Sequence, residues 1–344
     1  MQRPVLAWTV GDPTGVGPEV IVGAWTQPEV HAMCRPLVVG HPEMLRRAAR
    51  LLAVNVEVRE IASPADAVAS PTVIPCLRTG SDDVLDVPPA TVDPRAGQAA
   101  YDALVVGARL ALDGAVDGIV TAPLHKAALW QAGHHYPGHT ELLAELCDVH
   151  DFAMMLYLGP DASLGCSAGL GVIHVTLHMA LAEVWKHLTT DAVVTKIRLA
   201  EGVMRRMAVG RTPRIGVCAL NPHAGESGLF GDEETRIIAP AVARARAERI
   251  DAAGPFPTDT LMVRARDGEF DAVVAMYHDQ GHIALKLLGM HRAVNVTLGL
   301  PIVRTSVAHG TAFDLAWQGR AETSSMVEAV RVASRLAQHT GSSY

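Results

Sequence analysis

The sequence lacks cysteine pairs, basic clusters and long hydrophobic runs, and each absence excludes a class of protein. Its five cysteines are an odd number without a Cys-x-x-Cys pair, which favours reduced thiols in the cytoplasm over a disulfide framework. The formal net charge of −7, with no basic stripe, argues against nucleic-acid binding. No apolar run approaches the roughly 18 residues of a membrane span, and Gly11, Asp12 and Pro13 interrupt the apolar stretch that a signal peptide would need. We therefore expect a cytoplasmic protein with no membrane or nucleic-acid partner.

Short apolar strands and amphipathic helices alternate along the 344 residues. Hydrophobic residues make up 49% and charged residues 19%, which suits a packed globular core. Strands are expected at 5–10, 36–40, 118–122, 153–158, 171–176, 214–220, 271–276 and 294–298. This alternation predicts an α/β fold with a mostly parallel sheet covered on both faces, in two domains with a cleft. Residues 63–94 and 252–257 are expected to be loops, and 180–208 a helix.

Three histidines, His178, His223 and His278, each follow the end of an expected strand, in runs with little other reason to be polar. Neutral imidazole is the commonest metal ligand in proteins, and three imidazoles with one open position suit a catalytic divalent ion. A metal enzyme is therefore the first hypothesis. The alternative is a scatter of surface and core histidines, since the chain has sixteen.

Other runs have residues that suit an anion site, without a unique signature. Residues 11–19 form a strand–turn–helix start that fits neither a Walker A loop nor Gly-x-Gly-x-x-Gly, so a structural turn and a binding turn are both open. His139 and Thr140 open a helix where a phosphate would be favoured, although His139 alone also suits a capping role. Lys286 and Arg304 lie among apolar residues, which indicates either a bound anion or an internal ion pair.

Taken together, the motifs resemble those of one family over nearly the whole chain. They are Gly11-Asp-Pro-x-Gly-x-Gly-Pro-Glu19, Thr121-Ala-Pro-x-x-Lys126, Gly138-His-Thr-Glu141, Asn221-Pro-His-Ala-Gly-Glu226, Asp259, His278-Asp-Gln-Gly-His282 and Ser306-x-x-His-Gly-Thr-Ala-Phe-Asp314. Their identity and order are similar to those of the 4-hydroxythreonine-4-phosphate dehydrogenases of pyridoxal phosphate biosynthesis. The resemblance implies an isocitrate/isopropylmalate dehydrogenase-like α/β fold. A first domain would cover 1–130 plus about 300–344, and a second about 131–299.

The same resemblance implies a homodimer whose active sites are shared between the subunits. It assigns a divalent metal such as Zn²⁺, Mg²⁺ or Co²⁺ to His178, His223 and the partner's His278. It assigns the substrate to His139, Thr140, Lys286, Asn295 and Arg304. The stretch with His309, Gly310, Thr311, Ala312 and Asp314 is similar to the segment that binds the adenosine half of NAD in isopropylmalate dehydrogenases, where small residues let the backbone approach the nucleotide. NAD and NADP are both open as the cofactor.

The implied reaction is NAD(P)-dependent oxidation and decarboxylation of a 4-phosphorylated 3-hydroxy acid. The first expectation is 4-phosphohydroxy-L-threonine, which yields 3-amino-2-oxopropyl phosphate and CO2. A divalent ion would act as a Lewis acid toward the C3 hydroxyl as hydride leaves for the nicotinamide. Asp259 is a candidate base or orienting residue.

One run departs from the family pattern and keeps other substrates open. His174-Val-Thr-Leu-His178 replaces the Thr-Thr-His-Leu-Pro-Leu more usual in the pyridoxine enzymes. It is closer to relatives that oxidise D-threonate or D-erythronate 4-phosphate, and to terephthalate dihydrodiol dehydrogenases. The complete anion-binding set favours a phosphorylated linear substrate over the dihydrodiol. A non-catalytic metal- or nucleotide-binding dimer is the least expected reading, because every ligand position is filled.

Overall fold

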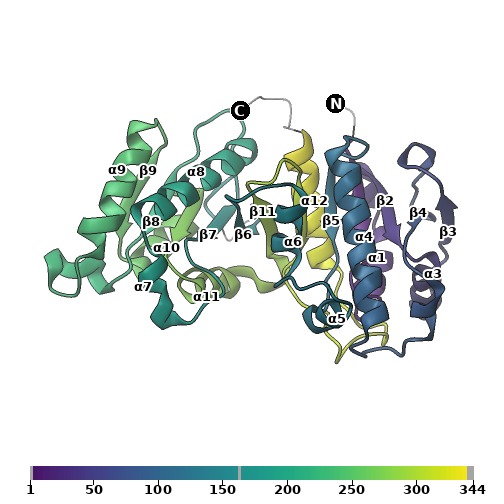
Figure 1. Ribbon diagram of the computed structural model, residues 1–344. Helices are drawn as coiled ribbons and strands as arrows, with labels where there is room; N and C mark the ends of the chain where they lie inside the picture. The colour runs from purple at the N-terminus through teal and green to yellow at the C-terminus, as the bar shows by residue number, and fades with distance from the viewer. Residues whose placement is uncertain (1–2, 162–163, 339–344) are drawn as a thin grey trace. The chain divides into compact units, whose positions relative to one another are not determined.

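The computed structural model describes residues 3–161 and 164–338, which form two compact units. Unit 1 comprises Met1–His150 and Leu300–Tyr344, and unit 2 comprises Asp151–Gly299. The sequence placed the corresponding boundary near residue 130, before helix α6 (His139–Leu146), which belongs to unit 1. Each unit combines helices with mostly parallel strands, as the α/β prediction requires (Figure 1). Among the described residues, no helix has both the length and the hydropathy needed to cross a membrane.

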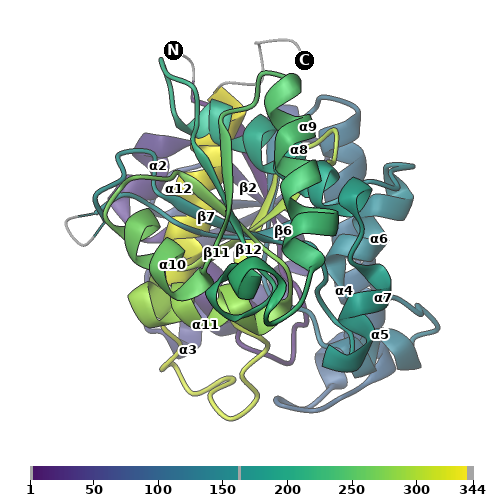
Figure 2. The ribbon, with the colours of Figure 1, turned by 90° about the vertical axis from the view of Figure 1, so that its left-hand side faces the viewer.

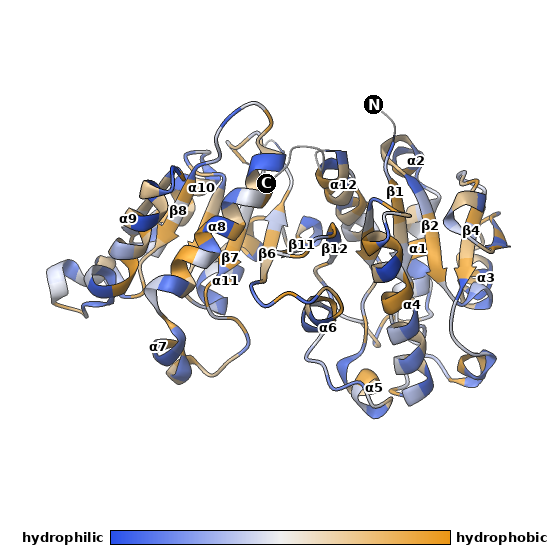
Figure 3. Ribbon diagram, turned by 45° about the horizontal axis from the view of Figure 1, so that its top comes forward, coloured by the Kyte–Doolittle hydropathy of each residue, from blue (hydrophilic) through white to orange (hydrophobic). Residues whose placement is uncertain are grey.

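The strands of unit 1 are parallel and follow the order β3-β4-β2-β1-β5-β12. Their bounds are β1 Val5–Thr9, β2 Arg35–Gly40, β3 Glu57–Ile61, β4 Val73–Arg78, β5 Gly118–Thr121 and β12 Arg304–Val307. In β1, Leu6, Ala7 and Trp8 have no exposed surface, and β1, β2 and β4 stand out as hydrophobic in Figure 3. Continuous apolar runs of this kind are typical of parallel strands that are covered on both faces.

Helices cover both faces of these strands. They are α1 Gly17–Trp25, α2 Pro28–Met33, α3 Pro42–Leu51, α4 Pro94–Leu112, α5 Lys126–Gln131, α6 and α12 Ser324–Gln338, with 3-10 turns at Pro64–Asp66 and Asp82–Asp86. α4 packs on β1, β2 and β5, whereas α12 packs on β5 and β12 and contacts α1. The connection from β1 to β2, which contains α1, runs in one direction along the strand order, whereas the connection from β4 to β5, which contains α4, runs in the other. Because such connections are right-handed, the two helices lie on opposite faces of the strands.

The strands of unit 2 follow the order β11-β6-β7-β10-β8-β9, with β6 antiparallel to β11 and β7 and the other neighbours parallel. Their bounds are β6 Ala153–Leu158, β7 Leu170–His174, β8 Ile215–Cys218, β9 Ala252–Phe256, β10 Ala272–Ala275 and β11 Val294–Leu298. Because β7, β10 and β8 are parallel neighbours, the segments that follow them leave the sheet at the same edge. Those segments carry His178, His278 and His223.

The main helices of unit 2 also lie on both faces of its strands. α8 (Thr190–Met207) packs on one face, and α10 (Thr258–Arg266) and α11 (His278–Gly289) pack on the other, as Figure 2 shows around β7. The remaining helical segments are Leu181–Glu183, α7 Val184–His187, Pro222–Gly228, Glu234–Ile238, α9 Ala239–Ala247 and Met290–Arg292. This layering confirms the prediction of a mostly parallel sheet covered on both faces.

Three secondary-structure expectations are wrong. Residues 252–257 are not a loop, because Ala252–Phe256 forms β9, and Val73–Arg78 forms β4 inside the expected loop at 63–94. Pro255 is tolerated because β9 is the edge strand of unit 2. Proline has no N–H, and at an edge strand this removes no hydrogen bond between central strands. The expected helix at 180–208 is interrupted because Thr189 is extended and caps α8, accepting from the N–H of Ala192 at 3.1 Å.

Candidate active site

Arg304 is a buried cation at the start of β12. It is 3% exposed, and its Nε and Nη2 atoms donate to Oγ1 of Thr121 on the neighbouring strand β5, at 3.2 and 2.7 Å. Burial lowers the pKa of Arg304 to about 10, while the charge of Glu141 acts in the opposite direction. The guanidinium therefore stays protonated at neutral pH, and its burial favours an anion as a further partner.

The N-terminus of α6 adds to the positive field near Arg304. The helix begins at His139, after Gly138, and no side chain caps its N-terminus. Burial holds the pKa of His139 well below its ordinary value, and the charges of Arg304 and Lys126 lower it further, so the imidazole is neutral at pH 7. Thr140 is the second residue of the same helix. Unit 1 thus brings together His139, Thr140 and Arg304 in an arrangement that suits an anion.

Lys126 and Thr121 belong to this arrangement, although the sequence alone did not single them out as site residues. Lys126 begins α5, and its Cε lies 3.8 Å from the position that a Cβ on Gly138 would take. Both residues belong to the motif Thr121-Ala-Pro-x-x-Lys126, which is the feature of the sequence that could have identified them as site residues. A threonine at the end of a buried strand and an exposed lysine on the next helix are common structural features, so only the fold shows that they lie beside the cation and the helix terminus.

His178 and His278 lie close together in unit 2, at one end of a row of histidines. Their ring centroids are 5.9 Å apart, which is compatible with two imidazoles on one ion at Zn–N distances of about 2.0–2.1 Å. His278 stacks on His282, one turn further along α11, with centroids 3.9 Å apart, and Nδ1 of His282 is 3.0 Å from Nε2 of His174. Two of the three predicted metal ligands are therefore neighbours.

His174 and His282 extend the row, although the sequence reasoning did not assign them a function. Burial lowers the pKa of His174 well below its ordinary value, and the neighbouring histidines lower it further. Burial, followed by the charge of His278, lowers the pKa of His282 to about 4. Both rings are neutral at pH 7, so they place no repelling charge beside a cation. The His-x-x-x-His spacing at 174–178 and again at 278–282 is the signal for this row in the sequence.

His223, the third predicted ligand, is exposed on a turn that follows β8. Residues 223–227 of this turn all have left-handed backbone conformations. Within residues 3–161 and 164–338, no group of three or more His, Cys, Asp and Glu side chains is arranged to hold a metal ion. The structure brings His178 and His278 together, and it does not bring His223 to them within one chain.

The other predicted residues of unit 2 lie on three elements. Lys286 is on α11, two turns after His278, and its charge helps to lower the pKa of His282, which places it beside the histidine row. Asn295 is the second residue of β11. Asp259 is exposed in the first turn of α10, where its Oδ1 accepts from the N–H of Thr260 at 2.8 Å. This local bond is the contact that the structure shows for Asp259.

The expected nucleotide stretch, His309 to Asp314, follows β12 and packs on the glycine turn at 11–19. The N–H of Val16 donates to the carbonyl oxygen of Thr311 at 3.1 Å, and a Cβ on Gly15 would come within 2.9 Å of the Thr311 Cβ. Glycine at position 15 therefore permits the contact. Gly310 faces open space, and Ala312 has a left-handed φ of 43°. The turn at 11–19 thus shapes an open loop whose small residues fit the backbone approach that a dinucleotide needs.

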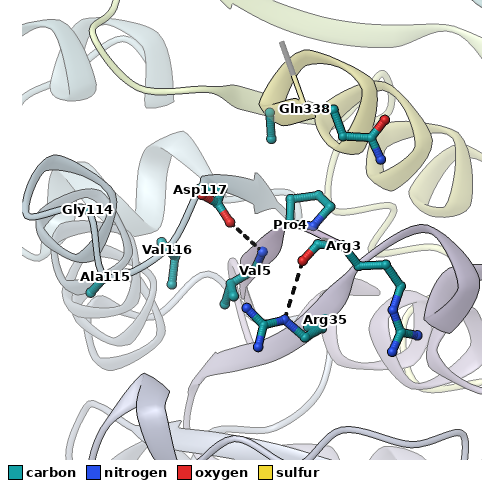
Figure 4. Close-up of a pocket in the computed structure, with 10 residues that line it drawn as sticks. Arg3, Pro4, Val5, Arg35, Gly114, Ala115, Val116, Asp117 and Gln338 are labelled. Carbon is teal, nitrogen blue, oxygen red and sulfur yellow. Dashed lines mark hydrogen bonds between the residues drawn. The ribbon is translucent and has the colours of Figure 1, made fainter. Parts of the chain in front are cut away.

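A cavity of about 490 Å³ in unit 1 is lined by other residues (Figure 4). Its wall includes Arg3, Val5, Arg35 and Asp117, and the N–H of Val5 donates to Oδ2 of Asp117 at 2.7 Å. Val5 and Arg35 begin β1 and β2, so this cavity lies at the amino ends of the strands. In parallel sheets the binding groups gather beyond the carboxyl ends, where Thr121 ends β5. The cavity is therefore not the candidate active site.

Known proteins match this chain over almost its full length. The sequence model of the family described as pyridoxal phosphate biosynthetic protein PdxA matches residues 32–333. A D-threonate 4-phosphate dehydrogenase from Pectobacterium atrosepticum is 46% identical over 335 residues, which cover 97% of this chain and 99% of that protein. A 4-hydroxythreonine-4-phosphate dehydrogenase from Beijerinckia indica is 47% identical over 338 residues, which cover 96% of this chain and 94% of that protein.

The fold agrees with these matches. The crystal structure of a 4-hydroxythreonine-4-phosphate dehydrogenase from Klebsiella pneumoniae aligns with 97% of this chain and 100% of its own, with a TM-score of 0.86 and 45% identity. The family resemblance and the fold class predicted from the sequence are confirmed. The chain therefore belongs to the PdxA family and is an oxidoreductase.

Proposed function

We propose that the chain oxidises the C3 hydroxyl of a 4-phosphorylated 3-hydroxy acid with NAD or NADP, and that the resulting β-keto acid loses CO2. The observation that carries the proposal is the buried cation Arg304 beside the neutral His139 and the N-terminus of α6. The relatives named for 4-hydroxythreonine 4-phosphate and for D-threonate 4-phosphate match almost equally well. The phosphorylated end common to both is the part of the substrate that these residues fit.

The residues of unit 1 are suited to hold that phosphate. Thr121 fixes the guanidinium of Arg304, so the cation does not have to be ordered when the anion arrives. The N–H groups at the start of α6 present a partial positive charge. Burial and the nearby charges of Arg304 and Lys126 keep His139 neutral before binding, so it adds no third repelling cation to this arrangement. The low polarity of a buried site strengthens the resulting attraction.

We assign the divalent cation to His178, His223 and the partner's His278, because three imidazoles with one open position suit such an ion. Imidazole suits Zn²⁺, Co²⁺ and similar ions, and Mg²⁺ remains open. We assign the dinucleotide to His309, Gly310, Thr311, Ala312 and Asp314. When bound, the cation supplies Lewis acidity toward the substrate hydroxyl and the nicotinamide accepts the hydride. Lys286 and Asn295 are assigned to the remaining polar groups of the substrate, and Asp259 to orienting the reacting groups.

Large apolar side chains that are exposed in unit 2 support a homodimer with shared active sites. They follow the three predicted ligands along the chain: Leu181 and Trp185 after His178, Leu229 and Phe230 after His223, and Ile283, Leu287 and Met290 after His278. Leu287 is 83% exposed and Leu229 is 71% exposed. Exposed apolar side chains of this size, on the segments that carry the predicted ligands, favour a protein interface there. A second copy would cover them and would bring the partner's His278 to the ligands of the first chain.

Mixing two inactive variants should therefore restore activity. If each site takes His178 from one subunit and His278 from the other, a heterodimer of His178→Ala and His278→Ala subunits has one intact site. Random reassortment of equal amounts would restore roughly a quarter of the wild-type activity. Native mass spectrometry establishes the exchange, and NADH formation measures the recovery. No recovery among proven heterodimers would mean that the pair observed at 5.9 Å within one chain serves a single site.

The proposed reaction is tested by comparing substrates that differ at C2 and at C4. 4-Phosphohydroxy-L-threonine, our first choice, has an amino group at C2, whereas D-threonate and D-erythronate 4-phosphate have a hydroxyl there. D-threonate 4-phosphate is the second choice, because the run from His174 to His178 resembles the enzymes that use it. We expect turnover of at least one of the three and at least about a tenfold lower kcat/KM for the same acid without its phosphate, since one charged hydrogen bond contributes about 1.5–3 kcal/mol. Equal turnover of both forms, or none of any, would contradict the proposal.

A further inference from the structure

The turn that carries His223 has an unusual backbone. Its φ angles are 51° at His223, 53° at Ala224, 76° at Gly225, 42° at Glu226 and 58° at Ser227. For L-residues other than glycine, the left-handed region is disfavoured because the Cβ comes close to the following carbonyl oxygen. Five left-handed residues in succession, four of them not glycine, persist only where the surrounding structure holds them. Something next to this turn must therefore restrain it.

Glu234 supplies that restraint at the start of the turn. It is 5% exposed and opens the segment Glu234–Ile238. Its Oε1 accepts from the backbone N–H groups of Leu220 and Asn221, at 2.8 and 2.7 Å, and its Oε2 accepts from Nδ2 of Asn221 at 3.0 Å. Asn221 is the residue from which the turn departs. One buried carboxylate thus fixes both the main chain and the side chain at this point.

The same carboxylate also backs the middle of the turn. A Cβ on Gly225 would lie 2.8 Å from Oε2 of Glu234 and 2.9 Å from the carbonyl oxygen of Gly231, so glycine is needed there. The N–H of Phe230 closes the turn by donating to the carbonyl oxygen of Gly225 at 3.1 Å. Glu234 therefore touches the turn at its beginning and at its centre, while the imidazole of His223 projects from an exposed residue between these points.

We propose that Glu234 is the positioning residue for His223: it holds the left-handed turn in the one conformation that presents this imidazole to the metal. The inference rests on the proposed function, because it takes His223 to be a ligand. Glu234 itself does not touch the reacting groups. Its removal should lower the affinity for the metal by loosening the ligand, since outer partners of metal ligands typically contribute about tenfold to a hundredfold in affinity.

The chain offers a matched control in Glu19. This glutamate is 1% exposed, and its two carboxylate oxygens accept from the backbone N–H groups of Trp317 and Gly319 in unit 1. It has the same chemistry and the same burial as Glu234, but it anchors the segment that follows the proposed nucleotide loop. Replacing Glu19 tests the general effect of losing a buried carboxylate, apart from any effect on the turn at 223–227.

The experiment measures the Zn²⁺ affinity of the metal-free full-length protein by competition with a chromophoric chelator. Wild type, Glu234→Ala, Glu234→Gln and Glu19→Gln are compared, with circular dichroism to verify folding. We expect Zn²⁺ to bind at least about tenfold more weakly to Glu234→Ala. Glu234→Gln should lose less, because its Oε1 can still accept from Leu220 and Asn221. Glu19→Gln should keep the wild-type affinity. Hydrogen exchange at Leu220 and Asn221 should become faster only in Glu234→Ala, because Glu234→Gln keeps both main-chain hydrogen bonds.

The other possible results of this experiment would each contradict one part of the proposal. Equal Zn²⁺ affinity in wild type and both Glu234 variants would overturn the positioning role. An equal loss in Glu19→Gln would overturn it too, because the effect would then be general. If Glu234→Ala does not fold, Glu234→Gln decides the question, since it keeps the size of the side chain and the two main-chain hydrogen bonds. If the wild type and the His223→Ala variant bind Zn²⁺ with equal affinity, the proposed metal site fails, and the positioning role of Glu234 falls with it.

Discussion

Replacing His223 with alanine should release the divalent metal and reduce kcat/KM by about 1,000-fold, since a Lewis acid supplies several kcal/mol of transition-state stabilisation and 1.36 kcal/mol corresponds to a factor of ten. His223 is exposed, so its truncation leaves no cavity in the core and the melting temperature should change little. Metal content measured by mass spectrometry and initial rates of NADH formation test both expectations on the same preparation.

Two comparisons give this result its meaning. Treatment of the wild type with EDTA should abolish activity, and added Zn²⁺ or Co²⁺ should restore it, whereas the same addition should not restore His223→Ala. His150→Ala serves as the control, because His150 is also an exposed histidine but follows none of the predicted ligand segments. Full activity of metal-free His223→Ala would refute the assignment of a catalytic metal to this histidine.

The sequence contained enough to predict the α/β fold and the edge of the sheet at which the predicted metal ligands leave it. Val172 and Val273 lie in short buried runs that were read as strands, and the structure pairs them in parallel. Because β7 and β10 are parallel, the segments that carry His178 and His278 leave the sheet at the same edge, and the structure places the two ring centroids 5.9 Å apart. Continuous apolar runs indicate the strands, because a strand that is covered on both faces is buried. The polar residues that follow each run indicate the end of the strand where they gather.

The local backbone of the site could not be predicted from the same patterns. Nothing in the residue types at 223–227, apart from Gly225, distinguishes a left-handed turn from an ordinary loop, because that conformation depends on the distant Glu234. The contribution of Lys126 has a similar origin. Lys126 comes to lie near Gly138 because α5 and α6 both pack on α4, and this packing cannot be read from the spacing of residues within one helix. The backbone of the turn and the position of Lys126 depend on contacts between different segments of the chain. The periodicity of hydrophobic residues predicts only the structure within one segment.

Replacing Arg304 with alanine should lower kcat/KM for the phosphorylated substrate by about tenfold to a hundredfold. A charged hydrogen bond contributes about 1.5–3 kcal/mol, and each 1.4 kcal/mol is a factor of ten. The loss should be similar across pH 6–9, because a pKa of about 10 keeps the guanidinium protonated throughout that range. Metal content should stay unchanged. Arg304→Lys keeps the charge but loses the planar fork, so it should recover only part of the loss.

Stability separates a binding function of Arg304 from a structural one. If Arg304 serves to bind an anion, its removal should leave the melting temperature unchanged or slightly higher, because a buried charge is costly to desolvate. An arginine that holds β12 to β5 through Thr121 would behave in the opposite way, because its loss would leave a buried hydroxyl without that partner. Suppose that Arg304→Ala unfolds readily while its folded fraction turns over the phosphorylated acid at the wild-type rate. The phosphate assignment would then be rejected, and a ring dihydrodiol, which has no phosphate, would become the better candidate substrate.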